Sequence, residues 1–261
     1  MKNFLSRFYL ALILIFMYLP IVVLIIFSFN ESKNMAVWTG FSLKWYEALF
    51  SDPIIGEAVW VTISIALLSA LIATVIGTMA AMGIQRMRRH TRNAVLNCTY
   101  IPMINADIVT GVSLLLLFIF LNIPRGYWTM LLAHITFNIP YVILSVLPKF
   151  SQMNPQIYEA ALDMGATPAY AVRKVVLPQI APGIMTGALL AFTMSFDDFV
   201  ISFFTTQGTT QNLSVYIYSM ARLGINPTIN ALSAIMFVVV IVLLLLINFQ
   251  SMRRNKLRTN F

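Results

Sequence analysis

The sequence predicts an all-α, polytopic membrane protein with six transmembrane helices. Three observations support this fold class: the composition, six long apolar stretches, and an uneven distribution of basic residues. Hydrophobic residues make up 59% of the 261 residues, charged residues only 10%, and the mean hydropathy is +0.84. Soluble domains are typically ~45–50% apolar and ~25% charged. The composition therefore excludes an ordinary soluble domain, a disordered segment and a disulfide-stapled module.

Six apolar stretches are each long enough to cross a bilayer, which takes about 20 helical residues. The first is too long for the apolar core of a signal peptide, so we expect it to be retained as a helix. The fourth carries His134, and the third and fifth carry aspartates. The stretches run from about 8 to 29, 58 to 84, 93 to 121, 127 to 147, 182 to 204 and 230 to 249.

Basic residues gather on one side of these predicted spans. Of the 17 Lys and Arg residues, 13 lie in the two terminal tails and in the loops after the second and fourth spans. They are Lys2, Arg7, Arg86, Arg88, Arg89, Arg92, Lys149, Arg173, Lys174, Arg253, Arg254, Lys256 and Arg258. Because cytoplasmic loops are rich in Lys and Arg, both termini are predicted to be cytoplasmic. The net charge of +8 then reflects the membrane topology, and no nucleic-acid partner is expected. Residues 1–261 are predicted to form one transmembrane domain.

The second span carries a ridge of small residues that predicts close helix packing. Small side chains at four-residue spacing let two helix backbones approach each other in a membrane. The ridge consists of Ser69, Ala73, Gly77 and Ala81. We interpret it as a packing surface and not as a site.

The cytoplasmic loop from about 150 to 182 predicts two short helices joined by a sharp turn. Asn154-Pro155 and Thr167-Pro168 each combine an N-cap residue with proline at the first helical position. Gly165 stands where the end of a helix favours positive φ. The second helix is expected to end before Pro178. The loop is therefore predicted to be a rigid protrusion that a partner could contact, or one that only packs against the helix ends.

The same loop resembles the EAA signature of ABC-importer permeases. Glu159-Ala160-Ala161 is followed after three residues by Gly165 and, with the family's spacing, by Leu177-Pro178. Val175 replaces the usual isoleucine, which is a conservative change. The signature also lies between the fourth and fifth spans, where the family places it. The chain is thus identified as a member of this family, with the MetI-like, type I importer architecture of a bacterial cytoplasmic (inner) membrane protein.

The resemblance extends over nearly the whole chain and is strongest to the polyamine branch, the PotC-like second permease of spermidine/putrescine importers. It implies a coupling role for Glu159, Ala160, Ala161, Gly165, Leu177 and Pro178, which would dock on an ATPase. The implied partners are a second permease chain, a homodimeric cytoplasmic ATPase, an extracytoplasmic polyamine-binding protein, the polyamine and the lipid bilayer. ATP, with Mg, would bind the ATPase.

The sequence contains no motif for nucleotide binding or metal-dependent chemistry. A P-loop needs Lys followed by Ser or Thr, and none of the six lysines is followed by either. There is no HExxH motif, and His90 and His134 lie far apart in the sequence. We therefore expect no catalytic residue, no metal site and no cofactor on this chain, and a transport subunit in place of an enzyme.

Three aspartates lie within predicted spans, where a carboxylate costs about 2.5–3.5 kcal/mol at mid-bilayer. Asp107 lies 13 residues after Ala94, and Asp197 lies 13 after Ile184. In straight helices, both would lie about 20 Å from the cytoplasmic face. We expect Asp107, Asp197 and Asp198 to act as counter-ions along a polyamine pathway. Alternatively, they bond to the ends of neighbouring helices or cap a kink.

Two other functional classes remain open at the level of sequence. An ion-coupled secondary carrier for a cationic solute could use the aspartates as ion sites, but it would leave the cytoplasmic loop without a role. An intramembrane enzyme could pair an aspartate with His134, although the adjacent Asp197 and Asp198 point about 100° apart on a helix. We expect His134 to be a hydrogen-bonded packing residue.

Overall fold

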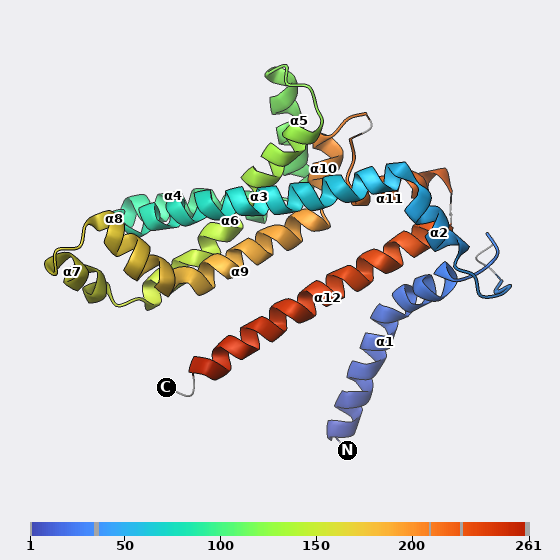
Figure 1. Cartoon of the computed structure of the whole chain (residues 1–261), viewed down its shortest axis with the longest axis horizontal. Coiled ribbons are helices and arrows are strands. Elements are labelled where there is room, and N and C mark those ends of the chain that lie inside the picture. Colours follow the sequence, from blue (N-terminus) through green and yellow to red (C-terminus); the bar gives the residue numbers. More distant parts are fainter. Residues whose placement is uncertain (1, 34–36, 209, 225–226, 259–261) are drawn as a thin grey trace. The chain divides into compact units, whose positions relative to one another are not determined.

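The computed structural model describes residues 2–33, 37–208, 210–224 and 227–258, and side chains within 6–242 except Pro155. This part of the chain is helical apart from loops and one isolated bridge, Asn30 to Phe41. The helices, in order, are α1 (Lys2–Ser28), α2 (Lys44–Ser51), α3 (Pro53–Gln85), α4 (Arg89–Ile104), α5 (Asp107–Phe120), α6 (Tyr127–Gln152), α7 (Pro155–Asp163), α8 (Pro168–Ala171), the π-helical segment η1 (Val172–Val176), α9 (Leu177–Phe196), α10 (Val200–Thr205), α11 (Leu213–Leu223) and α12 (Pro227–Arg258) (Figure 1).

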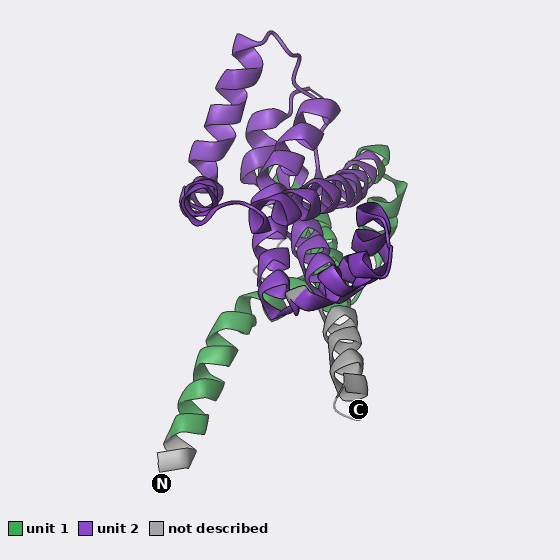
Figure 2. Cartoon of the chain, turned by 90° about the vertical axis from the view of Figure 1, so that its left-hand side faces the viewer, with its two compact units in different colours: residues 1–56, 217–261 green, residues 57–216 purple. Residues whose placement is uncertain are grey.

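The chain divides into two compact units, coloured separately in Figure 2. The first contains residues 1–56 and 217–261, and in it α12 packs against α1 and α2. The indole N–H of Trp45 in α2 donates to the carbonyl oxygen of Asn30 at 2.7 Å, which ties α2 to the end of α1. The apolar stretch of α1 from Ser6 to Ser28 is largely exposed, as expected of a helix that meets lipid or another chain.

The second unit, residues 57–216, is built on α3, α6 and α9, which run side by side (Figure 1). Its largest apolar cluster includes Ile84 from α3, Val146 from α6 and Ile180 from α9. The small-residue ridge of α3 is buried, as predicted, and a Cβ on Gly77 would lie 2.8 Å from Cβ of Val142 in α6. Glycine at position 77 therefore permits the close approach of α3 and α6.

The third predicted span is not straight. α4 and α5 are bent by 101° at a break over residues 105–106, where Asn105 and Ala106 have extended backbones. Pro102 lies three residues before the break and is accommodated within α4, which continues to Ile104. The predicted span 93–121 is therefore not one straight helix, and the depth of Asp107 calculated for a straight helix does not apply to it.

The fifth predicted span also differs from expectation. The helix is continuous from Pro168 to Phe196, so the second helix of the cytoplasmic loop does not end before Pro178 but continues into the span. The π-helical turn η1 precedes Pro178, and the N–H of Leu177 donates to the carbonyl of Val172, five residues back. This wider turn displaces the carbonyl that the Pro178 ring would otherwise meet. The helix then stops, and α10 begins at Val200.

Four described helices are long and apolar enough to cross a membrane, and the bent pair α4–α5 makes a fifth span if it is counted as one. Their apolar ranges are Ser6–Ser28, Pro53–Arg86, Tyr127–Gln152 and Pro168–Phe196. The predicted sixth span, 230–249, lies in α12 and extends past Val242, the last residue whose side chain is described. The all-helical, multi-span fold is thus confirmed, with two spans broken.

Replacing Gly77 with alanine should destabilise the protein, because the new Cβ would also lie 3.3 Å from the carbonyl oxygen of Ile139. We expect a loss of about 1–3 kcal/mol, as for an overpacked core. The melting temperature of the detergent-solubilised protein measures this loss. Gly83→Ala, on the same helix with nothing within 4 Å of the new Cβ, is the matched control. Equal melting temperatures for the two variants would contradict the close packing of α3 and α6.

Candidate functional site

The three membrane aspartates all lie at helix breaks. Asp107 is the first residue of α5 and is exposed. Asp197 follows the last residue of α9 and is also exposed, whereas the side chain of Asp198 is only 9% exposed. The two short helices beyond the breaks pack together, with Gly111 of α5 facing the ring of Phe204 near the end of α10. The broken spans therefore meet through α5 and α10.

Asp198 caps the N-terminus of α10. Its Oδ2 accepts the backbone N–H of Ser202 at 2.8 Å and the Ser202 hydroxyl at 2.9 Å. Its Oδ1 accepts the backbone N–H of Ile201 at 3.3 Å. The first N–H groups of a helix have no partner within it, and a carboxylate is among the best groups to satisfy them. This is the capping role that the sequence left open as an alternative.

His134 of α6 is buried and connects the two sides of the α9–α10 break. Its Nε2 lies 3.0 Å from Oγ of Ser202 and 3.4 Å from Oδ2 of Asp198. Its Nδ1 lies 3.0 Å from Oγ of Ser195, in the last turn of α9. His134 is 1% exposed, and the expectation of a hydrogen-bonded packing residue is confirmed.

A buried polar network extends from His134 to α3 and to the segment before α11. One turn along α6, the amide nitrogen of Asn138 donates to Ser195 at 2.8 Å and to Ser69 of α3 at 3.3 Å. On the other side, the amide nitrogen of Asn212 donates to the Asp198 carbonyl and to the Ser202 hydroxyl, each at 2.8 Å. The network comprises Ser69, His134, Asn138, Ser195, Asp198, Ser202 and Asn212.

Ser195, His134 and Asp198 follow one another in the order of a nucleophile, a base and an acid, which is the arrangement that an intramembrane enzyme would require. Ser195 is 1% exposed, and its hydroxyl already contacts Asn138 and, at 2.9 Å, Ser69. A nucleophile needs space for the group it attacks. The geometry therefore supports a structural network and not a reaction centre. In the described part of the chain, no three His, Cys, Asp or Glu residues gather as metal ligands.

The cytoplasmic loop forms the predicted turn. Asn154 accepts the N–H of Gln156 at 3.0 Å and Thr167 accepts that of Tyr170 at 3.4 Å, so both predicted N-caps are confirmed. Gly165 has φ +85°, the left-handed conformation that glycine adopts without strain. Glu159, on α7, is exposed. Ala160 is also exposed, whereas Ala161 and Leu177 are half-buried and Pro178 is exposed.

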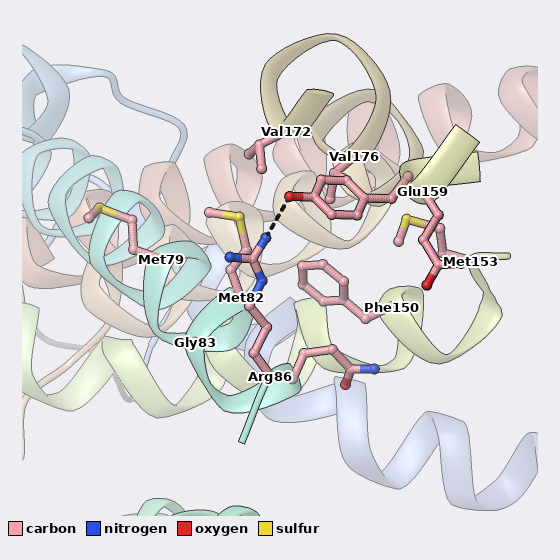
Figure 3. Close-up of a pocket in the computed structure, with 11 residues that line it drawn as sticks. Met79, Met82, Gly83, Arg86, Phe150, Met153, Glu159, Val172 and Val176 are labelled. Carbon is pink, nitrogen blue, oxygen red and sulfur yellow. Dashed lines mark hydrogen bonds between the residues drawn. The ribbon is translucent and has the colours of Figure 1, made fainter. Parts of the chain in front are cut away.

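A cavity of about 500 Å³ lies between α7 and the ends of α3, α6 and η1 (Figure 3). Arg86 extends across it, and its guanidinium donates to the Tyr158 hydroxyl at 3.3 Å and lies 5.6 Å from the ring centre. The rest of the lining is mostly apolar: Met79, Met82, Gly83, Gln85, Phe150, Met153, Glu159, Val172 and Val176. Tyr158 thus links α7 to Arg86, just beyond α3, and also packs against the apolar cluster of the second unit.

A family model described as "Binding-protein-dependent transport system inner membrane component" matches residues 73–255, which hold most of the small-residue ridge, the aspartates and the cytoplasmic loop. The chain belongs to this family. It is therefore a multi-pass permease of the inner membrane, a transport component that performs no catalysis. Permeases of this family work with an ATPase and a periplasmic binding protein.

Four similar proteins each cover more than three quarters of the chain. The spermidine/putrescine transport system permease PotC of Haemophilus influenzae is 35% identical over 97% of this chain and 99% of its own. The putrescine permease PotI of Escherichia coli is 39% identical over 84% and 81%. A bacterial alginate ABC importer has a TM-score of 0.73 at 21% identity, covering 97% and 96%. The methionine transporter MetNI has 0.62 at 21%, covering 78% and 96%. These two structures share the fold.

The sequence points to the aspartates but not to the residues that hold them. It places Ser69 on the packing ridge, and it gives Asn138, Ser195, Ser202 and Asn212 no role. One signal is available: small polar residues inside apolar spans are rarely without a partner. The pairing of Ser69, His134 and Asn138 with Ser195 and Ser202 cannot be derived, because these contacts join positions 57 to 126 residues apart.

Ser195→Ala should lower the stability of the permease by about 1–3 kcal/mol, because it leaves His134 Nδ1 and one Asn138 N–H buried without a partner. Thermal unfolding of the purified protein tests this. Ser113→Ala is the matched control, since Ser113 is exposed and its hydroxyl bonds only to Val109 in its own helix. A melting temperature for Ser195→Ala equal to that of the control would show that the network contributes nothing.

Proposed function

We propose that this permease forms the membrane pathway of an ATP-driven importer for polyamines, spermidine, putrescine or both. The observation that carries the proposal is the pair of exposed carboxylates at the breaks of two spans, Asp107 and Asp197, in a chain that resembles polyamine permeases over nearly all its length. A flexible polycation crossing an apolar barrier needs such counter-ions along its path.

The proposed topology has six transmembrane helices with both termini in the cytoplasm, in a single permease domain. The third span is the bent pair α4–α5, and the sixth is α12. The start of α4, exposed from Arg89 to Thr91, and the loop helix α7 then lie on the cytoplasmic side. This arrangement supports the docking of α7 on a partner in the cytoplasm.

The proposed complex contains a second permease chain, two copies of a cytoplasmic ATPase that bind ATP with Mg, and an extracytoplasmic protein that delivers the polyamine. The exposed Glu159 and Ala160 present a small-residue surface with one carboxylate, which suits close approach of a partner. Gly165, Leu177 and Pro178 act through shape: the first allows the turn behind α7, and the others join the loop to α9.

In the proposed cycle, the ATPase moves α7, and the motion reaches the aspartates along α9. The helix that begins three residues after Gly165 is continuous to Phe196, so displacement at its cytoplasmic end is transmitted to Asp197. The packed α3, α6 and α9 move as one body against the other permease chain, and the pathway opens to alternate sides. No covalent chemistry on this chain is involved.

Uptake by the reconstituted complex tests the proposal directly. Proteoliposomes that contain both permease chains and the ATPase should accumulate labelled spermidine or putrescine only with ATP and the binding protein. Competition between the two polyamines then ranks them. ATP-independent uptake driven by an ion gradient would support the secondary carrier instead, and uptake of neither polyamine would refute the substrate class.

In the same assay, Asp107→Asn and Asp197→Asn should each raise the KM for the polyamine about tenfold, the equivalent of 1.4 kcal/mol for a lost charge contact. Asp52→Asn, in the predicted outer loop, is the control, because asparagine can still accept the N–H of Ile54. If both membrane variants transported polyamine like the control, neither carboxylate would belong to the pathway.

Gly165→Val should uncouple ATP hydrolysis from uptake. Valine at φ +85° is strained by about 1–3 kcal/mol, so the turn behind α7 would change shape. We expect ATPase activity to persist while polyamine taken up per ATP falls. Gly165→Asn is the matched control, since asparagine tolerates this conformation. An unchanged ratio of uptake to hydrolysis in the valine variant would count against the coupling role.

A further inference from the structure

The geometry points to His134 as a positioning residue: it fixes Asp198 across the α9–α10 break and so leaves Asp197 as the carboxylate of the pair that meets the cationic substrate. This assignment rests on the proposed function and divides the work of two adjacent aspartates. His134 itself does not touch the substrate, because it is 1% exposed.

His134 holds both sides of the break from a helix that is not broken. α6 runs from Tyr127 to Gln152 and packs along α9. Nδ1 reaches Ser195 before the break, and Nε2 reaches Ser202 after it, both at 3.0 Å. One rigid, planar ring therefore sets the distance between the end of α9 and the first turn of α10. The aspartates occupy the chain between those two contacts.

The hydrogen bonds around the ring have a consistent direction. The Asn138 amide donates to Ser195 Oγ, so the Ser195 hydroxyl can donate to His134 Nδ1. Nε2 then carries the ring hydrogen and donates toward Ser202 and Asp198. The Ser202 hydroxyl completes the chain by donating to Asp198 Oδ2. Each donor has an acceptor, and the direction of donation ends at the Asp198 carboxylate.

The Asp198 carboxylate is thereby occupied. It accepts two backbone N–H groups and one hydroxyl, and His134 Nε2 lies 3.4 Å from it. A carboxylate offers about four lone-pair positions, so these neighbours fill its capacity. Its side chain is 9% exposed. Asp198 has little left with which to bind an incoming ammonium group.

Asp197, in contrast to Asp198, has an exposed side chain. Its backbone carbonyl accepts the Ser214 hydroxyl at 3.2 Å, while the neighbouring Asp198 carbonyl accepts the Asn212 amide at 2.8 Å. The backbone at both aspartates is thus anchored to Asn212, just before α11, and to Ser214, in the first turn of α11. With Asp198 turned into the network, the same fixed backbone holds Asp197 at the surface.

Cysteine reactivity tests the positioning without reference to transport. The chain has a single cysteine, so Cys98→Ser gives a background for Ile201→Cys, a position on α10 that is fully buried. In the assembled complex this thiol should react slowly with N-ethylmaleimide. Adding His134→Ala should raise the rate at least about tenfold, as loss of one hydrogen bond to a charged group would. Thr136→Ala, an exposed position on α6, is the control. An unchanged rate would overturn the positioning role.

Uptake kinetics test the division of the aspartates. His134→Ala and Asp198→Asn should each raise the polyamine KM with little change in maximal rate, and the double variant should match the singles. Adding Asp197→Asn to either His134→Ala or Asp198→Asn should raise the polyamine KM further. His134→Gln, which keeps a donor and an acceptor, should restore most of the affinity. Lower maximal rate with unchanged KM, or fully additive effects of His134→Ala and Asp198→Asn, would overturn the assignment.

The two experiments separate this inference from the proposed function. If wild-type complex takes up no polyamine, the substrate class fails, and the thiol measurement still decides whether His134 holds the break. If wild type transports polyamine but Asp198→Asn raises KM more than Asp197→Asn, the function stands and the division of the pair is wrong.

Discussion

A broken helix inside an apolar span creates backbone groups that only the protein can satisfy, and this constraint governs the arrangement of the second unit. Lipid offers no hydrogen bonds, so every freed N–H and C=O at mid-membrane needs an internal partner. At the break after α9, Asp198 takes the N–H groups of α10 and Asn212 takes a freed carbonyl. The break can exist because Asp198 itself and Asn212, just before α11, supply these partners, while His134 of α6 contacts the Asp198 side chain.

The same requirement accounts for the conjunction of polar residues and close packing. Ser69 lies on the small-residue ridge of α3, and its hydroxyl reaches Ser195 of α9 and the amide of Asn138 on α6 at 2.9 and 3.3 Å. Such short reach demands that three helices approach closely, which the glycine at 77 and the alanines beside it permit. The close approach of α3, α6 and α9 thus accounts both for their tight packing and for the hydrogen bonds of Ser69.

Local chemistry makes much of the fold predictable, and non-local geometry limits the rest. Asn154 and Thr167 as caps, and Gly165 at positive φ, follow from preferences of single residues over a few positions. Pro102 marks this span as irregular, but α4 continues through it, and neither the position of the break at 105–106 nor its angle of 101° follows from the proline. Pro178 is expected to end a helix, yet the π turn before it lets the helix continue. The partners of Asp198 include residues far away in sequence, so its role required the structure.

The π-helical segment η1, residues 172–176, sets the rotation about its own axis of the helix that joins the cytoplasmic loop to Asp197. A π turn holds about one residue more than an α turn, so every side chain beyond it is rotated by about 100° relative to a regular helix. The face of α9 that meets α6, and the direction in which the end of α9 emerges, are therefore set by one surplus residue near the cytoplasm. Removing one residue within 172–176 would therefore turn α9 by about 100° about its own axis and present a different face of it to α6.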